Sequence, residues 1–534
     1  MNRFRWNTPV VVGLYTVDIY NRMRFLFLWT NSILTGILLA LSFPGPPLES
    51  LQWIYSPYWA YCSLIPLLYS LTQCNGRKAF YLGWGAGITH NLLCLYWVAY
   101  TQGGGPAVVG GTLLLALYLG LFTAAWAWVF NKAYQNWHSL SFCLAPILWS
   151  TIEYALSLGE LGFPWLLLGH GHAGQIQFIQ FAAYTGVYGV SFWIVAINAL
   201  IMMGIYEENR LRKYYLIAIA TSFIGPWVYS KSVMSNGELS GEFIRVALVQ
   251  PNQRLEDKWG PNGLENSLNK LQNLSLKTLP EKPELIVWPE TALPCYLQHS
   301  AYCQNRIREF VNSTDIPLLT GASHYDSATR HPFNSAFFIT PNSSDLSSYA
   351  KMHLVPFGER TPYRDTIPFL RSIDWTKWTG DLGPAEFSPG VERTLFNHPK
   401  GKLGTLICFE SVFPDLVRRH VFHGAQVLIN ITNDSWFGLS AGPYQHALLN
   451  AMRAIENRIA IARSATTGQS LFIDRFGRQF KQSDLFVETS IISEVKLEAS
   501  GSFYTRNGDL FAWICSLTTA IVLIMLFRKP RTAS

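Results

Sequence analysis

The sequence has few charged residues. Asp, Glu, Lys and Arg make up 14% of its 534 residues, whereas soluble chains average roughly 25%. This deficit points to segments buried in lipid. The formal net charge of +7 comes without a long basic run, so nucleic-acid binding is not expected. We interpret the basic excess as a signal of membrane orientation.

Paired cysteine motifs are also lacking. Eight cysteines are scattered along the chain and none forms a CxxC pair, so a zinc site or a thioredoxin-like site is not expected. No metal or organic cofactor is predicted. Cys295 and Cys303 lie in a polar region and can form a disulfide if that region faces an oxidising compartment; the sequence leaves this open. Cys408 has no obvious partner.

Long apolar runs divide the chain into three parts. Because about 20 apolar residues span a bilayer, residues 1–240 are predicted to form a membrane domain of about seven helices. Residues 243–496 have mixed polarity and alternating strands, and residues 508–528 contain a last apolar segment. The predicted fold is a polytopic α-helical membrane domain of about eight spans plus an α/β domain. The expected spans cover residues 25–44, 55–73, 80–100, 107–130, 140–158, 176–203, 214–230 and 510–527.

Lys and Arg are distributed unevenly over the predicted loops. If the N-terminus is cytoplasmic, the inside loops carry Arg77, Lys132 and Arg212, whereas the outside loops at 101–106 and 159–175 carry no Lys or Arg. By the positive-inside rule, the domain at 243–496 is then expected on the outer face of the membrane.

Two predicted spans contain polar residues at membrane depth. Glu153 lies in the fifth span, and His90 and Asn91 lie in the third. A buried acid in a membrane helix is a functional candidate by default. The alternative, an interhelical hydrogen bond or a position near the end of the span, stays open.

Three polar residues follow predicted strands of the α/β domain. Glu290 lies just after the predicted strand Leu285–Trp288, Lys351 lies on an otherwise apolar strand, and Cys408 stands at a predicted strand-to-helix turn. Layered α/β folds place their sites at strand ends. The turn favours a thiolate on Cys408, Glu290 can act as its base, and Lys351, paired with Glu359, can hold an oxyanion.

Four motifs carry a family resemblance. WPE at 288–290, KMHLVPFGER at 351–360 and ICFE at 407–410 resemble the Glu–Lys–Cys triad of the nitrilase superfamily. Together with NDSWFGLSAGPYQH at 433–446, they are similar to its bacterial apolipoprotein N-acyltransferase branch. The resemblance covers the whole chain, including the membrane spans on both sides, and implies a nitrilase-like αββα sandwich.

The resemblance also implies roles for individual residues. The triad would be Glu290 as general base, Lys351 as oxyanion stabiliser and Cys408 as nucleophile. Supporting or substrate-contacting positions would be Glu359, Glu410, Trp259, Phe409, Trp436 and Phe437. Phe409 stands where the family often has Tyr, and Thr466 where Asn is common, so details of hydrogen bonding around the site are in doubt.

An apolar stretch between two of these motifs suits a lid. The segment 373–378, with Trp375 and Trp378, fits a mobile interfacial lid that admits acyl chains. An ordinary Trp-bearing surface loop is the open alternative.

The reaction implied by the resemblance uses the membrane itself. A phospholipid would be the acyl donor and a diacylglyceryl-lipoprotein the acceptor, in the bacterial inner membrane with the catalytic domain on the periplasmic side. A membrane-tethered amidase or nitrilase acting on a small C–N substrate shares the triad and is the main alternative, although it needs fewer spans. A transporter or scaffold with an inert domain is disfavoured by the intact Glu, Lys and Cys.

Overall fold

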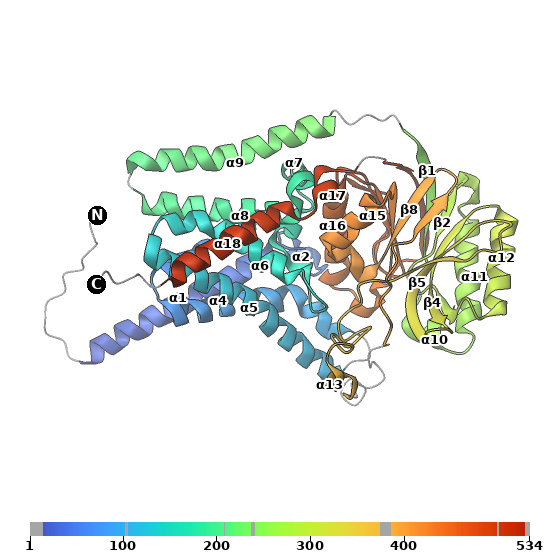
Figure 1. Cartoon of the computed structure of the whole chain (residues 1–534), viewed down its shortest axis with the longest axis horizontal. Helices are drawn as coiled ribbons and strands as arrows, with labels where there is room; N and C mark the ends of the chain where they lie inside the picture. The colour runs from blue at the N-terminus through green and yellow to red at the C-terminus, as the bar shows by residue number, and fades with distance from the viewer. Residues whose placement is uncertain are drawn as a thin grey trace.

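The computed structural model describes residues 14–101, 105–207, 209–235, 241–373, 386–498 and 501–528. Figure 1 shows a helical region and an α/β sandwich side by side, with α18 returning from the sandwich along the helical region. Both the helical segments and the αββα sandwich that the sequence predicts are confirmed.

The helical region contains most of the first 235 residues and one C-terminal helix. Its α-helices are α1 (Leu14–Leu41), α2 (Glu49–Gln52), α3 (Ile65–Thr72), α4 (Gly76–Leu95), α5 (Gly105–Trp137), α6 (Leu140–Leu156), α7 (Ile176–Ile179), α8 (Ala182–Tyr206), α9 (Asn209–Ser235) and α18 (Leu510–Phe527). Its 3-10 helices are η1 (Pro57–Tyr61), η2 (Tyr96–Tyr100), η3 (Pro164–Leu166) and η4 (Leu168–His172).

The expected count of about eight spans is not confirmed. Among the described residues, four helices are long and apolar enough to cross a membrane: Asn21–Leu41, Gly105–Trp137, Ala182–Tyr206 and Leu510–Phe527. The predicted span at 55–73 is wrong as a single helix, because it is divided between η1 and the eight-residue α3, each with a proline in its first turn. Helix α6 is apolar but only 17 residues long.

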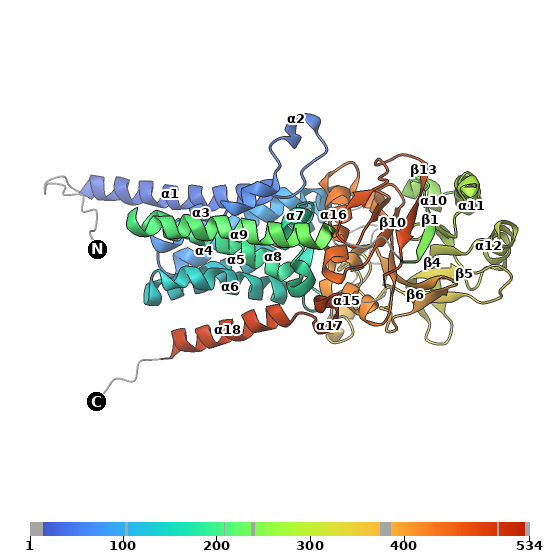
Figure 2. The same cartoon turned by 90° about the horizontal axis from the view of Figure 1, so that it is seen from above.

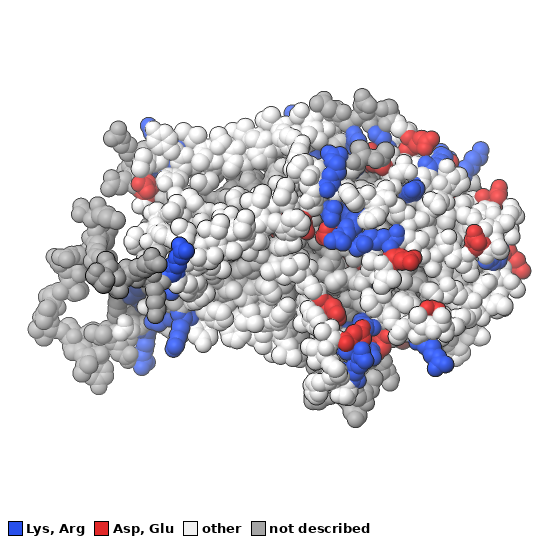
Figure 3. Space-filling model, viewed as in Figure 1, with Lys and Arg blue, Asp and Glu red and all other residues white. Residues whose placement is uncertain are grey.

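Charge is arranged along the long axis of the molecule. On the face drawn in Figure 3, few Lys, Arg, Asp or Glu side chains lie over the middle of the helical region, while both signs are mixed over the sandwich. The C-terminal end of α4 faces the sandwich, since the following Tyr96 hydroxyl accepts a hydrogen bond from Ala441 N at 3.1 Å. Arg77, at the start of this 20-residue helix, therefore lies at the opposite end.

The sandwich consists of two sheets. The first has the order β13-β1-β2-β4-β5-β6, with β3 on β4, and the second has the order β12-β11-β10-β9-β8-β7. The strands of the first sheet are β1 (Phe243–Gln250), β2 (Leu285–Val287), β3 (Leu293–Tyr296), β4 (Leu318–Asp326), β5 (His331–Ile339), β6 (Ser347–Ala350) and β13 (Thr489–Lys496). Those of the second sheet are β7 (Leu395–His398), β8 (Gly401–Ile407), β9 (Val427–Thr432), β10 (Ile461–Ala465), β11 (Leu471–Ile473) and β12 (Gln479–Phe480).

Alternating side chains build the layers of the sandwich. Val246 on β1 and Ile429 on β9 are fully buried between the sheets, and their neighbours on each strand point outward. Helices α11 (Gly263–Leu276) and α12 (Ala301–Thr314) cover the first sheet, with α10 (Leu255–Trp259) beside them. Helices α15 (Pro414–Phe422) and α16 (Ala441–Asn457) cover the second.

Helix α16 is buried on both sides because it lies between the second sheet and the helical region (Figures 1 and 2). The Gln445 Oε1 atom accepts hydrogen bonds from the indole nitrogens of Trp97 at 3.1 Å and Trp165 at 3.0 Å. Further along, Glu456 accepts one from Val187 N at 2.8 Å. The sandwich is thus joined to the helices through a continuous packed interface.

Candidate active site

Three strand ends deliver the predicted triad to one place. Glu290 follows β2, Lys351 follows β6 and Cys408 follows β8. The Cys408 thiol lies within electrostatic reach of both Glu290 and Lys351. The structure therefore brings together the three residues that the motifs single out, at the carboxyl ends of strands, as expected for a layered α/β fold.

Lys351 is held by two carboxylates. Its Nζ lies 2.8 Å from Glu359 Oε2 and 3.5 Å from Glu290 Oε1, and its side chain is 1% exposed. The amide of Asn334 donates to Glu290 at 2.7 Å and to Glu359 at 3.0 Å. Burial alone would lower the pKa of Lys351, but Glu359 and Glu290 raise it, so the ammonium stays charged beside the thiol.

Glu290 is also fixed from the second sheet. Its Oε2 accepts a hydrogen bond from Asn433 N at 2.9 Å, and its exposed fraction is 6%. With Asn334 on one oxygen and the Asn433 backbone on the other, the carboxylate has little freedom to rotate. A carboxylate oriented in this way can exchange a proton with the neighbouring sulfur.

Cys408 stands in a left-handed backbone conformation, with φ of +51°. It begins η7 (Cys408–Val412), a five-residue 3-10 turn directly after β8. The expectation that this turn favours a thiolate is not met. Burial, followed by Glu290, raises the pKa of Cys408, and Lys351 only partly opposes this. The Cys408 side chain is therefore a thiol at neutral pH and needs a base to become a thiolate.

Glu410 supports the turn from inside. It is fully buried, and its carboxylate accepts hydrogen bonds from Tyr349 Oη at 2.8 Å, Met352 N at 2.7 Å and Ile407 N at 2.8 Å. Burial raises its pKa to about 7. By bridging the strand end before Cys408 and the segment after Lys351, Glu410 holds these two residues in a fixed relative position.

Aromatic rings separate the site from the helical region. Phe409 is 3% exposed, and its ring centroid lies 5.7 Å from that of Phe163 and 6.3 Å from that of Trp165. The ring of Phe437, on η8 (Asp434–Phe437), meets that of Trp97 at 4.5 Å. Cys408 thus lies next to an apolar wall that helices and sandwich share.

The remaining predicted residues are placed differently. Trp436 is half-buried on η8. Trp259 is 61% exposed on α10, beside Lys258, whose Nζ donates to Thr291 Oγ1 at 2.9 Å; Trp259 is therefore near the Glu290 turn but not packed into it. Trp375 and Trp378, the predicted lid residues, lie outside the described residues.

Two open questions of the sequence have structural answers. Cys295 and Cys303 form a disulfide. Glu153 accepts hydrogen bonds from the Trp149 indole at 2.8 Å and from Leu168 N at 2.7 Å, which favours a hydrogen-bonding role. It also lines a cavity of about 50 Å³ in the helical region, together with His90 and Asn91.

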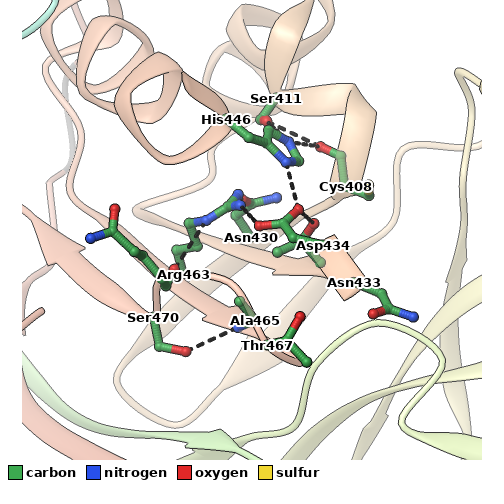
Figure 4. A network of polar contacts seen from close by, with 12 residues as sticks. Cys408, Ser411, Asn430, Asn433, Asp434, His446, Arg463, Ala465, Thr467 and Ser470 are labelled. Atoms are coloured by element: carbon green, nitrogen blue, oxygen red, sulfur yellow. Dashed lines mark hydrogen bonds and ion pairs between the residues drawn. The ribbon is translucent and has the colours of Figure 1, made fainter. Parts of the chain in front are cut away.

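A buried polar network beside Cys408 was not predicted from the sequence (Figure 4). His446 Nδ1 lies 2.9 Å from Asp434 Oδ1, and the other carboxylate oxygen of Asp434 accepts a hydrogen bond from Arg463 at 2.8 Å. His446 Nε2 lies 3.1 Å from the carbonyl oxygen of Cys408. Asp434 and His446 lie inside the 433–446 motif, but nothing in the motif indicates that His446 contacts Cys408 or that Asp434 orients it.

Comparison with known proteins agrees with this architecture. The carbon-nitrogen hydrolase family model matches residues 245–504, and the model of the apolipoprotein N-acyltransferase N-terminal domain matches residues 35–200. Among solved structures, Nit3 of Saccharomyces cerevisiae, a member of branch 10 of the nitrilase superfamily, is 20% identical with a TM-score of 0.37, covering 49% of this chain and 92% of its own.

Curated relatives match nearly the entire chain. The protein named apolipoprotein N-acyltransferase in Geobacter metallireducens is 34% identical over 93% of this chain and 95% of its own length. The protein of the same name in Chlorobaculum tepidum is 32% identical over 93% and 96%. Together with the apolar helices, these matches show that the chain is a multi-pass membrane acyltransferase that belongs to the apolipoprotein N-acyltransferase family.

Proposed function

We propose that this enzyme moves a fatty acyl chain from a membrane phospholipid, through a thioester on Cys408, to the α-amino group of the N-terminal diacylglyceryl-cysteine of a lipoprotein. The observation that carries the proposal is the buried Glu290–Lys351–Glu359 cluster beside the Cys408 thiol. The family relationship supports the acceptor, and the apolar wall beside the site supports a lipid donor.

The first half-reaction forms the thioester. Glu290 takes the thiol proton, and the sulfur of Cys408 attacks the ester carbonyl carbon of the phospholipid. Negative charge develops on the carbonyl oxygen, where the Lys351 ammonium stabilises it. The carbon–oxygen bond to glycerol then breaks, Glu290 returns the proton to that oxygen, and lysophospholipid leaves.

The second half-reaction forms the amide. The neutral α-amine of the acceptor attacks the thioester carbonyl carbon, and Glu290 accepts the proton that the nitrogen loses. The carbon–sulfur bond breaks, and Glu290 returns the proton to the sulfur of Cys408. Because water competes with the amine, the site needs shielding, and the packed rings of Phe409 and its neighbours supply it on one side.

We further propose a bacterial inner-membrane location with a helical domain over 1–240, a periplasmic catalytic domain over 243–496 and a final helix over 508–528. The distribution of Lys and Arg supports this orientation. The Cys295–Cys303 disulfide lies in the sandwich, and disulfides persist in oxidising compartments such as the periplasm.

Mass spectrometry of the purified full-length protein tests the reaction. Incubation with phospholipid should add one acyl mass to the peptide containing Cys408 and release an equal amount of lysophospholipid. Addition of a diacylglyceryl-cysteine peptide should then remove the adduct and give an N-acylated peptide. An enzyme that instead hydrolyses small amides and never forms the adduct would be the amidase alternative.

Reporter fusions test the orientation. A reporter inserted after Tyr229, near the end of α9 that leads into the sandwich, should report an extracytoplasmic position. A reporter after Lys78, at the start of α4, should report the cytoplasm and serves as the control. Cytoplasmic activity of the Tyr229 fusion would place the catalytic domain on the wrong side for this proposal.

A further inference from the structure

The Cys408 carbonyl is embedded in a fully buried polar network. Ser411 Oγ donates to this carbonyl at 3.0 Å and lies 3.2 Å from His446 Nε2, which is itself 3.1 Å from the carbonyl oxygen. Ser411 and His446 have no exposed surface. Imidazole, hydroxyl and carbonyl therefore form a closed triangle directly behind the nucleophile (Figure 4).

Asp434 orients the imidazole of this triangle. Burial alone would raise the pKa of Asp434, but Arg463 and His446 lower it to about 2. Asp434 therefore presents a charged carboxylate to His446 Nδ1. Thr432 Oγ1 donates to the same carboxylate at 3.1 Å. The Asp434 carboxylate requires a hydrogen on Nδ1, and burial and Arg463 lower the pKa of His446. Nε2 of the neutral ring therefore carries no hydrogen and accepts from the Ser411 hydroxyl, which also donates to the Cys408 carbonyl.

The titratable and charged groups around His446 are few. Asp434 and Arg463 face it from one side and Cys408 from the other, while the Trp165 ring lies 5.1 Å from its own. Gly468 lets Asp434 approach, because a Cβ at this position would lie 2.2 Å from Asp434 Oδ2. Strands β9 and β10 and helix α16 thus all contribute to one fixed arrangement.

The conformation of Cys408 gives this arrangement a purpose. A non-glycine residue with φ of +51° is strained and persists only where its surroundings hold it. The direction of the sulfur depends on that backbone conformation. An error of about 1 Å in the position of a reacting group can cost about 100-fold in rate.

We propose that His446 is a positioning residue: its Nε2 fixes the Ser411 hydroxyl, which donates to the Cys408 carbonyl and so aims the sulfur at the Glu290–Lys351 pair. This inference rests on the proposed role of Cys408 as nucleophile. It assigns His446 no contact with the substrate. Substitution of His446 should therefore slow thioester formation without lowering the affinity for phospholipid.

Two substitutions separate the two ends of the ring. His446→Asn keeps an amide nitrogen near the Nδ1 position, toward Asp434, and leaves the Ser411 hydroxyl without its acceptor on the ring. His446→Gln places its side-chain amide near the Nε2 position, where the amide oxygen can still accept from Ser411. We expect the Asn variant to form the thioester about 10–100-fold more slowly at unchanged KM for phospholipid, and the Gln variant to stay within a few-fold of the parent.

His398 provides the matched control, because its Nε2 contacts the Glu284 carbonyl at 2.9 Å far from the nucleophile. His398→Asn and His398→Gln should both keep the parent rate. Thermal unfolding of each variant shows whether it folds; if His446→Asn does not, Ser411→Ala removes the same link from the other side and should slow thioester formation several-fold.

Equal losses in both His446 variants, or a parent-like rate in His446→Asn, would overturn the positioning role. Failure of the proposed function looks different: the parent enzyme itself would then form no acyl adduct on Cys408. In that case the rate of iodoacetamide alkylation of Cys408 still compares the variants, with slower alkylation expected for His446→Asn and an unchanged rate contradicting the inference.

Discussion

Replacement of Cys408 with Ala should abolish both half-reactions while the protein still folds and inserts. In the proposed reaction the sulfur holds the acyl chain, and loss of a covalent nucleophile costs on the order of 10⁶-fold in a hydrolase with a comparable acyl-enzyme. No acyl mass should appear on the protein, and no N-acyl peptide should form. The side chain is small and partly exposed, so thermal unfolding in detergent should change little.

The control for this experiment is another free cysteine. Cys143 is exposed on α6, and Cys143→Ala should keep parent-like adduct formation and transfer. If the Cys408→Ala protein still N-acylates the lipoprotein peptide, a thioester on this residue is not part of the pathway.

Replacement of Lys351 with Met should remove catalysis and also destabilise the sandwich. The ammonium is 1% exposed and pairs with Glu359 and Glu290. Removing one partner of a buried ion pair typically costs about 3–5 kcal/mol, and here it leaves two carboxylates facing each other. The oxyanion also loses its cation, so the acyl adduct on Cys408 should not accumulate. Thermal unfolding and intact-protein mass spectrometry measure the two effects separately.

The double variant K351M/E359Q separates stability from chemistry. Neutralising Glu359 removes most of the repulsion, so the unfolding temperature should recover toward the parent value while thioester formation stays absent. Lys400→Met is the surface control: Lys400 pairs with Glu284 at 2.7 Å, but both side chains are more than one-third exposed, and such pairs contribute about 0–1 kcal/mol. Normal adduct accumulation in Lys351→Met would exclude the assigned role.

The strands around the site could be predicted from the sequence because their β-branched runs are local. The β-branched run at 243–250 predicts a strand, which is β1, and the runs at 403–408 and 425–431 predict strands that correspond to β8 and β9 within two residues. The segment 264–279 predicts a helix, which is α11 (Gly263–Leu276). Pattern and structure agree here because each strand is buried on both faces, which requires an apolar run wherever it occurs.

The helical region was harder to predict because hydropathy does not show where helices break. Pro57 and Pro66 divide one apolar run into η1 and α3. Helix α4 begins with Gly76, Arg77 and Lys78, and it contains His90 and Asn91, which lowers its hydropathy although it packs among the other helices. Apolar runs therefore located the helices but not their lengths.

Helix α16 shows why part of the site could not be predicted. Its sequence places Leu448, Met452 and Ile455 on one face, which indicates an amphipathic helix with an exposed polar side. In the structure His446, on the opposite side of the helix, is fully buried, and Gln445, which borders the apolar face, is almost fully buried. Their partners come from the helical region and from residues after β8 and after β9, and no local pattern encodes contacts between such distant segments.

The burial of α16 has a consequence for substrate choice. Because this helix packs between the sheet and Trp97 and Trp165, the Cys408 sulfur stays at a fixed depth relative to the apolar helices. We expect substrates to be selected by the depth at which their reactive carbonyl or amine lies when their acyl chains are inserted in the bilayer. A compound with the right functional group but no acyl chain should rarely bring that group to the depth of the Cys408 sulfur.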